Sequence, residues 1–124
     1  MTAYKRGEVV LVGFVFADES GAKHRPALVL SSRAYHKNRQ EVVVAAVTSN
    51  VDRVLFGDYT LAEWKKAGLL FPSLVTGILR TIKLQMIHRR LGSVSARELT
   101  AIDANVRNIL GLGGAWRTDA MPLT

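Results

Sequence analysis

Apolar residues along the chain gather in short runs of strand length, separated by turn-forming residues. The runs are rich in β-branched and aromatic residues, which at this length indicates strands rather than helices. We predict strands at residues 8–16, 26–31, 41–47, 73–84 and 86–94, and a short additional strand at 57–61. The first three are apolar at nearly every position, which predicts burial on both sides of a small sheet or barrel. Gly13, inside the first run, indicates a bend or a bulge.

A segment near the C-terminus has the periodicity of a helix instead. Ser95 and Glu98 have the spacing of a capping box, the usual start of a helix. Apolar residues then recur on one helical face as far as Gly111: Leu99, Ile102, Val106 and Ile109. This pattern predicts a C-terminal helix that packs one apolar stripe against the sheet. One or two helical turns are also predicted at residues 61–68, ending at Gly68.

The order of these elements predicts the fold class. Five to seven short strands followed by a helix indicate a mainly β domain, a small SH3-like antiparallel barrel with a C-terminal helix. The chain has 124 residues, a common size for one domain, and no repeat or interdomain linker divides it. We expect residues 1–112 to form this domain. Residues 113–124 are predicted to form a flexible tail unless Trp116 finds a pocket.

The chain shows no feature of a membrane or secreted protein. Its longest apolar run extends from Val9 to Ala17, less than half of the ~20 residues that a membrane-spanning helix needs. The N-terminal residues lack the apolar region and cleavage site of a secretory signal. The chain has no cysteine, which rules out disulfides and thiolate metal sites. We therefore expect a cytoplasmic protein.

The net charge points to a polyanionic partner. Seventeen Lys and Arg residues against ten Asp and Glu residues give a formal charge of +7. Nucleic acid is the first candidate for such a protein, although solvated surface charge that aids solubility gives the same total. The basic residues that we expect to contact RNA fall on two predicted loops: Lys23, His24 and Arg25 on one, and Arg33, His36, Lys37 and Arg39 on the next.

The sequence lacks the motifs of nucleotide-dependent and metal-dependent enzymes. It has no Gly-rich phosphate loop, no H-E-x-x-H and no Gly-x-Ser-x-Gly. The three histidines are too scattered along the sequence to predict a metal site. His24 and His36 could act as general base and acid in RNA cleavage, but surface histidines on two loops are the simpler interpretation. His88 is expected on a strand surface.

Arg25 and Thr48 form the remaining candidate constellation. Arg25 lies at the start of the second predicted strand and Thr48 at the end of the third, and antiparallel pairing would place these ends side by side. A guanidinium and a hydroxyl together can stabilise the charge that develops on phosphate oxygens when a ribose 2′-hydroxyl attacks phosphorus. Alternatively, Thr48 only closes a turn, and Arg25 only pairs with Asp18 or Glu19.

Four segments, residues 7–35, 42–49, 67–75 and 91–112, resemble the MazF/PemK family of toxins from type II toxin-antitoxin systems. The resemblance covers nearly the whole chain. Its most specific parts are the segment from Arg25 to Ser31 and the pair Thr48-Ser49, in the right order and spacing. Where many members carry a polar, often glutamine-bearing stretch before a basic residue, this chain has Gly77-Ile78-Leu79-Arg80, and only the base matches.

The resemblance implies a homodimeric CcdB/MazF-like barrel that cleaves single-stranded RNA without a metal or cofactor. The products would carry a 2′,3′-cyclic phosphate, and an antitoxin peptide would neutralise the protein. Arg25 and Thr48 match the catalytic arginine and threonine of the family, Glu19 loosely matches an acidic residue, and Arg80 matches the base of the later strand. The alternative is a binding protein on the same barrel, either a gyrase poison or a regulator that binds RNA or antitoxin. A gyrase poison has no use for the Arg25 and Thr48 pair.

Overall fold

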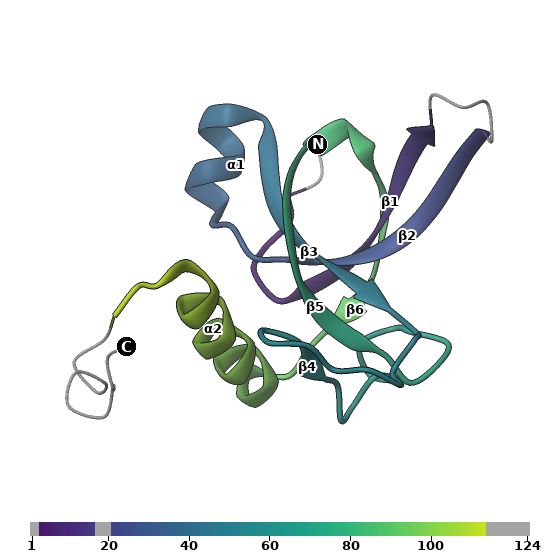
Figure 1. Ribbon diagram of the computed structural model, residues 1–124. Helices are drawn as coiled ribbons and strands as arrows, with labels where there is room; N and C mark the ends of the chain where they lie inside the picture. Colours follow the sequence, from purple (N-terminus) through teal and green to yellow (C-terminus); the bar gives the residue numbers. More distant parts are fainter. Residues whose placement is uncertain (1–2, 17–20, 114–124) are drawn as a thin grey trace.

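The computed structural model describes residues 3–16 and 21–113 (Figure 1). Its elements follow one another along the chain as β1 (Glu8–Phe16), β2 (Gly21–Val29), α1 (Arg33–Arg39), β3 (Glu41–Thr48), β4 (Tyr59–Thr60), β5 (Leu74–Lys83), the 3₁₀ turn η1 (Leu84–Met86), β6 (Ile87–Ser93) and α2 (Ala96–Leu110). The strands form one antiparallel sheet in the order β4-β5-β3-β2-β1-β6. This arrangement confirms the predicted fold class, as an open barrel whose outer strands β4 and β6 are not paired with each other.

The sheet is strongly curved (Figure 1). It buries side chains on both of its faces. Successive residues of a strand point to opposite faces, so each apolar strand can supply two cores. One core contains Val9, Leu28, Ala45, Val47, Val75 and Ile102. The other contains Val10, Val12, Ala27, Val29, Val42, Val44, Ile82 and Ile87. The continuous apolar runs of the sequence are therefore strands with two buried faces, as predicted.

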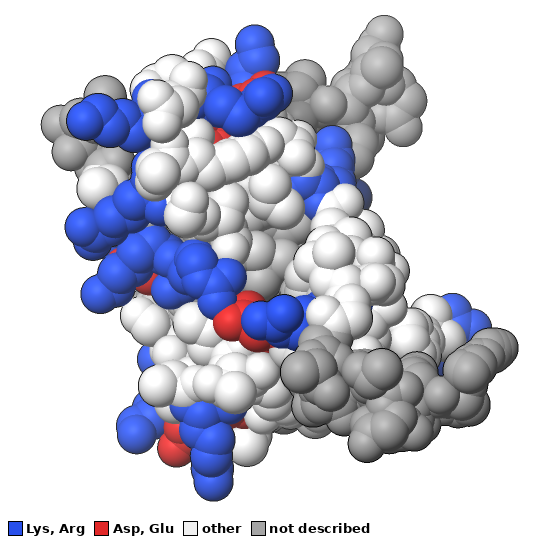
Figure 2. Space-filling model, turned by 90° about the vertical axis from the view of Figure 1, so that its left-hand side faces the viewer, with Lys and Arg blue, Asp and Glu red and all other residues white. Residues whose placement is uncertain are grey.

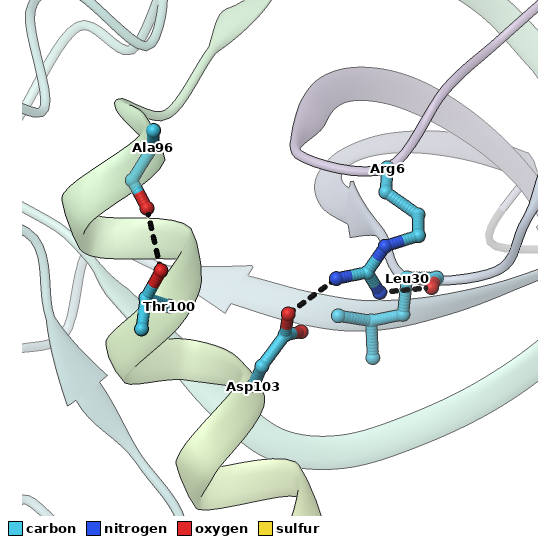
Figure 3. Close-up of polar contacts among 5 residues, drawn as sticks. All are labelled: Arg6, Leu30, Ala96, Thr100 and Asp103. Atoms are coloured by element: carbon cyan, nitrogen blue, oxygen red, sulfur yellow. Dashed lines mark hydrogen bonds and ion pairs between the residues drawn. The ribbon is translucent and has the colours of Figure 1, made fainter.

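Helix α2 covers the first core and is fixed to the sheet by polar contacts (Figure 3). Arg6, just before β1, donates a hydrogen bond of 2.7 Å from Nη1 to the carbonyl oxygen of Leu30 and forms an ion pair with Asp103 of α2. Within α2, the Thr100 hydroxyl donates a hydrogen bond of 3.0 Å to the carbonyl oxygen of Ala96 in the preceding turn. Arg6 thus links the start of the sheet, the end of β2 and the helix.

At the start of α2, only one of the two hydrogen bonds of the predicted capping box forms. Ser95 Oγ accepts a hydrogen bond from the Glu98 backbone N–H at 3.2 Å, as a cap requires. The Glu98 side chain is almost fully buried and turns toward the loop before β5. There its carboxylate accepts hydrogen bonds from Tyr59 Oη at 2.9 Å, from the Ala62 N–H at 2.7 Å and from the Glu63 N–H at 3.3 Å. Glu98 therefore joins α2 to that loop.

Two local predictions need correction. Strand β2 begins at Gly21, five residues earlier than expected, because its first half pairs with β1 across a hairpin. The segment from Arg33 to Arg39 is a helix, capped by Ser32, where a loop was predicted. Its single buried side chain is His36, so it carries no apolar stripe that periodicity could reveal.

The segment at residues 61–68 forms the predicted helical turn, in which the Ala67 N–H donates a hydrogen bond of 3.2 Å to the Glu63 carbonyl oxygen. It ends, as predicted, at Gly68, which has φ +87°. The predicted tail lies mostly outside the described residues. None of the helices among the described residues is long and apolar enough to cross a membrane.

Candidate active site and basic surface

The ladder between β2 and β3 is short, and a cavity opens where it stops. The last pair of the ladder is Ala27 with Ala46. Two residues further along the same register, Arg25 would face Thr48, but the strands separate before that point. A cavity of about 980 Å³ occupies the separation, and Arg25 and Thr48 both line it. The strand geometry thus brings these two side chains to one site, as the sequence predicts.

Thr48 takes part in a local turn, and its hydroxyl group can still donate a hydrogen bond. Its Oγ1 accepts a hydrogen bond of 3.1 Å from the Asn50 N–H, the turn-closing role that the sequence left open as an alternative. That bond uses an acceptor lone pair of the hydroxyl, so the hydroxyl proton can still be donated into the cavity. Both interpretations of Thr48 are therefore compatible.

Arg25 is exposed on β2, and its other suggested partners cannot be placed. Asp18 and Glu19 lie outside the described residues. The acidic role suggested for Glu19 therefore stays a prediction.

The cavity combines positive charge with apolar walls. Three arginines line it from three different strands: Arg25 from β2, Arg80 from β5 and Arg89 from β6. At its rim Leu70, Phe71 and Ile78 leave 83%, 62% and 60% of their surface exposed. Such a surface suits an anionic ligand with flat apolar groups, because guanidinium groups bind phosphate and aromatic rings stack on bases.

Sequence reasoning missed Arg89, Leu70 and Phe71 as members of this site. Arg89 stands in a strand between other basic residues, so nothing local distinguishes it. The exposure of Leu70 and Phe71 depends on how residues 69–73 cross the open end of the sheet, which periodicity does not encode. The only available signal was two large apolar residues directly before Pro72, in a segment with no alternation.

The basic residues do not lie on two loops, as the sequence suggested. Lys23, His24 and Arg25 belong to β2, and Arg33, Lys37 and Arg39 to α1. Of the two groups only Arg25 lines the cavity. Arg39 Nε donates to Glu41 at 2.8 Å, and its guanidinium lies over the Tyr35 ring. Figure 2 shows basic side chains spread in several groups over the helix-bearing side, with few acidic ones between them.

The structure contradicts the placement of His36 on a basic surface. His36 is buried beneath α1, where its Nε2 lies 2.7 Å from Ser31 Oγ, which itself accepts a hydrogen bond from the Val43 N–H. Burial lowers the pKa of His36, and a backbone interaction with Tyr4 opposes that change in part. A buried, neutral imidazole in this position cannot work with His24 as an acid and base pair.

His24 instead meets the third histidine. Its Nε2 lies 2.8 Å from the Nε2 of His88 on β6, and both rings are exposed. Two of the three histidines thus meet, although they lie far apart in the sequence. Within the described residues, no group of three or more His, Cys, Asp or Glu side chains could hold a metal ion.

Comparison with known proteins places the chain among toxins. A family model described as "PemK-like, MazF-like toxin of type II toxin-antitoxin system" matches residues 5–110. No curated protein sequence matches the chain significantly.

Solved structures share the fold at low sequence identity. A MazE-MazF structure from Deinococcus radiodurans is similar with a TM-score of 0.77 and 22% identity, over 91% of this chain and 100% of that one. An endoribonuclease from a mycobacterial species gives 0.71 and 19%, over 92% and 97%. The Mycobacterium tuberculosis toxin MazF-mt6 gives 0.71 and 24%, over 86% and 99%.

Proposed function

The chain belongs to the PemK-like, MazF-like toxins of type II toxin-antitoxin systems, and from this membership we propose that it cleaves single-stranded RNA without a metal ion. The observation that supports the proposal most directly is the position of Arg25 and Thr48 on one cavity between diverging strands. Similar folds include proteins described as endoribonucleases. The net charge of +7 suits an RNA substrate.

The proposed reaction is attack of a ribose 2′-hydroxyl on the adjacent phosphorus. The 2′-oxygen forms a bond to phosphorus as it loses its proton, the bond from phosphorus to the 5′-oxygen breaks, and that oxygen gains a proton. The products are a 2′,3′-cyclic phosphate and a 5′-hydroxyl. Negative charge develops on the non-bridging oxygens during the attack. Arg25 can hold them with two parallel N–H groups and Thr48 with a third hydrogen bond.

The remaining basic residues are proposed to bind the RNA strand around the reacting phosphate. Arg80 and Arg89 lie in the cavity itself and would hold neighbouring phosphates. Lys23 and His24 extend the basic surface along β2, and Arg33 and Lys37 add exposed cations on α1. Phe71 offers a ring on which a base can stack. Ile78 lies in the cavity where many family members have a polar stretch, so base selection by apolar contact is expected here.

Two protein partners complete the proposal. The D. radiodurans structure is of MazE with MazF, and a further mycobacterial endoribonuclease, similar with a TM-score of 0.71, is in complex with its cognate antitoxin. We propose that an antitoxin likewise binds this chain, through an acidic segment that covers the basic cavity. A homodimer and a cytoplasmic location are part of the same proposal.

One experiment tests the activity and the mechanism together. Purified protein is incubated with a long single-stranded RNA in excess EDTA, and the ends of the products are mapped. We expect cleavage in EDTA and 2′,3′-cyclic phosphate ends. Cleavage that stops with EDTA and returns with Mg²⁺ would contradict the metal-free mechanism. RNA binding without cleavage under any condition would favour the non-catalytic alternative.

A further inference from the structure

His24 and His88 form a pair whose geometry differs from that of a simple hydrogen bond. Their Nε2 atoms are 2.8 Å apart, while the ring centres are 4.1 Å apart and the ring planes are inclined by 87°. In a straight N–H···N hydrogen bond the rings would lie end to end, with their centres much further apart. Because the ring centres are closer together than an end-to-end arrangement allows, the two rings are inclined to each other, with both Nε2 atoms on the facing side of the pair.

Two features of the backbone bring the rings together. Between the pairs Leu11 with Arg89 and Val12 with Ile87, strand β6 holds one residue more than β1, and that residue is His88. The bulge moves His88 out of the regular alternation of β6; bulges of this kind commonly re-aim a side chain. On the other side of β1, His24 is paired with Gly13. The two rings thus come from β2 and β6 and meet over β1.

Gly13 leaves the room that the two rings occupy. A Cβ at this position would lie 3.1 Å from His88 Nε2 and 3.3 Å from His24 Cδ2, closer than ordinary packing allows. The predicted bend at Gly13 is therefore better explained as space for the imidazoles. A glycine, a bulge and two histidines from three adjacent strands meet at one point. Two histidines that were merely exposed would need neither the glycine nor the bulge.

We propose that His24 and His88 form a two-histidine chelate for a late first-row transition-metal ion, Cu²⁺ or Ni²⁺, with water in the remaining positions. Imidazole nitrogens bind such metals at about 2.0–2.1 Å. Two nitrogens 2.8 Å apart then subtend an angle of about 85–90° at the metal, which is the angle of tetragonal rather than tetrahedral coordination. Both rings are exposed, so an ion can reach the two Nε2 atoms directly.

The surroundings restrict which ions can bind. Arg25 and Arg89 neighbour the two histidines in sequence, and this positive field opposes any cation. Mg²⁺ and Ca²⁺ depend on charged oxygen ligands, which the pair does not offer. Cu²⁺ and Ni²⁺ form strong bonds to neutral imidazole, and at physiological salt repulsion between exposed charges is screened beyond about 8 Å. The site therefore selects for metals at the strong end of the Irving–Williams order.

The test uses the full chain and Cu²⁺ as the probe, with Ni²⁺ and Zn²⁺ for comparison. Titration calorimetry should give one Cu²⁺ ion per chain, bound more tightly than Ni²⁺ or Zn²⁺. His24→Gln and His88→Gln should each weaken binding by at least about tenfold, as loss of half of the protein ligands requires. Electron paramagnetic resonance should show coupling to two imidazole nitrogens in the unmodified chain and to one in either variant.

His36→Gln is the matched control, and Gly13→Ala is a further test of the space that the rings need. His36→Gln removes a histidine that faces Ser31 instead, and should bind Cu²⁺ as the unmodified chain does. Gly13→Ala keeps both ligands but fills the space under the rings, and should weaken binding. The same affinity in all four variants would assign the ion to another group, and no binding at micromolar Cu²⁺ would show that the pair is only a hydrogen bond. Either result overturns the proposal. Cleavage in EDTA tests the proposed function separately.

Discussion

Arg25 is the residue on which the proposed chemistry depends. An exposed arginine with no role should tolerate replacement with a stability change below about 0.5 kcal/mol and no loss of activity. A preorganised donor to a transition-state oxyanion behaves differently, since its removal costs about 10²–10³ in rate. The rate of the chemical step, and not the stability of the fold, therefore distinguishes an arginine with no role from one that stabilises the transition state.

We predict that Arg25→Ala slows single-turnover cleavage by about 10²–10³-fold at saturating RNA, with the fold unchanged by circular dichroism. Arg25→Lys should be nearly as slow, because lysine keeps the charge but cannot present two parallel N–H groups to phosphate. Thr48→Ala should cost less, since a neutral hydroxyl forms a weaker hydrogen bond than a guanidinium. Thr48→Ser should retain most of the activity.

Arg39→Ala is the control for this series. Arg39 is also an exposed arginine, but it pairs with Glu41 and does not line the cavity. Its replacement should leave the single-turnover rate unchanged and alter RNA affinity at most modestly. Equal rates for Arg25→Ala and Arg39→Ala would show that Arg25 only binds phosphate.

His36 predicts a pH dependence of stability. Burial lowers the pKa of its imidazole in the folded chain below the ordinary value of 6.5. Between the two pKa values the unfolded chain binds more protons than the folded chain, so stability rises with pH. The contribution is complete above pH 6.5 and is lost as the pH falls through the folded-state pKa.

Urea unfolding at pH 7.5 and pH 5 should therefore show a larger loss of unfolding free energy in the unmodified chain than in His36→Gln. An identical pH dependence in His36→Gln would contradict the assignment.

At the scale of elements, the sequence predicts those helices and strands that bury several apolar side chains. Strands β1 and β3 were predictable because they are nearly continuous apolar runs of strand length, and α2 because its apolar residues recur at the helical period. Strands β5 and β6 were found from their content of β-branched and other apolar residues, although β6 buries only Ile87. Helix α1 was not, since its one buried side chain is a histidine. The first half of β2 was not either, because Lys23, His24 and Arg25 are exposed and give this part of the strand no apolar pattern.

The candidate site shows the same division. Arg25 and Thr48 could be brought together from sequence, since both stand at predicted ends of neighbouring strands. The positions of His88 and Arg89 could not be predicted, because they depend on a bulge in β6 that has no signal in the sequence of that strand. Glu98 was found as a cap, but its main partners are far away in sequence.

Glu98 is predicted to be the polar residue of α2 with the largest effect on stability. Glu98→Ala would leave two backbone N–H groups and the Tyr59 hydroxyl without their partner, and one unpaired buried donor costs about 1–3 kcal/mol. We expect a loss of about 3 kcal/mol or more in urea unfolding, with Glu98→Gln intermediate. Arg97→Ala, at the exposed neighbouring position, should change stability by less than about 0.5 kcal/mol. Similar values for the two alanine variants would show that Glu98 acts only as a helix-terminal charge.

At the scale of the whole molecule, the large exposed apolar side chains of the described residues lie in two places. One is the rim of the cavity, with Leu70, Phe71 and Ile78. The other joins the loop before β4 to the end of α2, and contains Val54, Leu55, Phe56, Leu110 and Leu112. Its two parts adjoin, because a Cβ on Gly57 would lie 2.8 Å from Ile109 Cγ1. Contiguous apolar surface of this kind usually marks an interface.

We predict a homodimer that uses the second of these surfaces, since the cavity must stay open for RNA. Light scattering on the purified chain at micromolar concentration should give twice the mass of one chain. Phe56→Ser should shift the protein toward monomer, because Phe56 is 78% exposed in the single chain and its loss removes apolar area from the interface without touching a core. Phe71→Ser should keep the dimer and weaken RNA binding instead, through loss of a stacking ring. A monomer at this concentration would refute the dimer. If Phe71→Ser alone dissociates it, the second copy covers the cavity rim, and RNA must approach the Arg25 and Thr48 pair across the dimer.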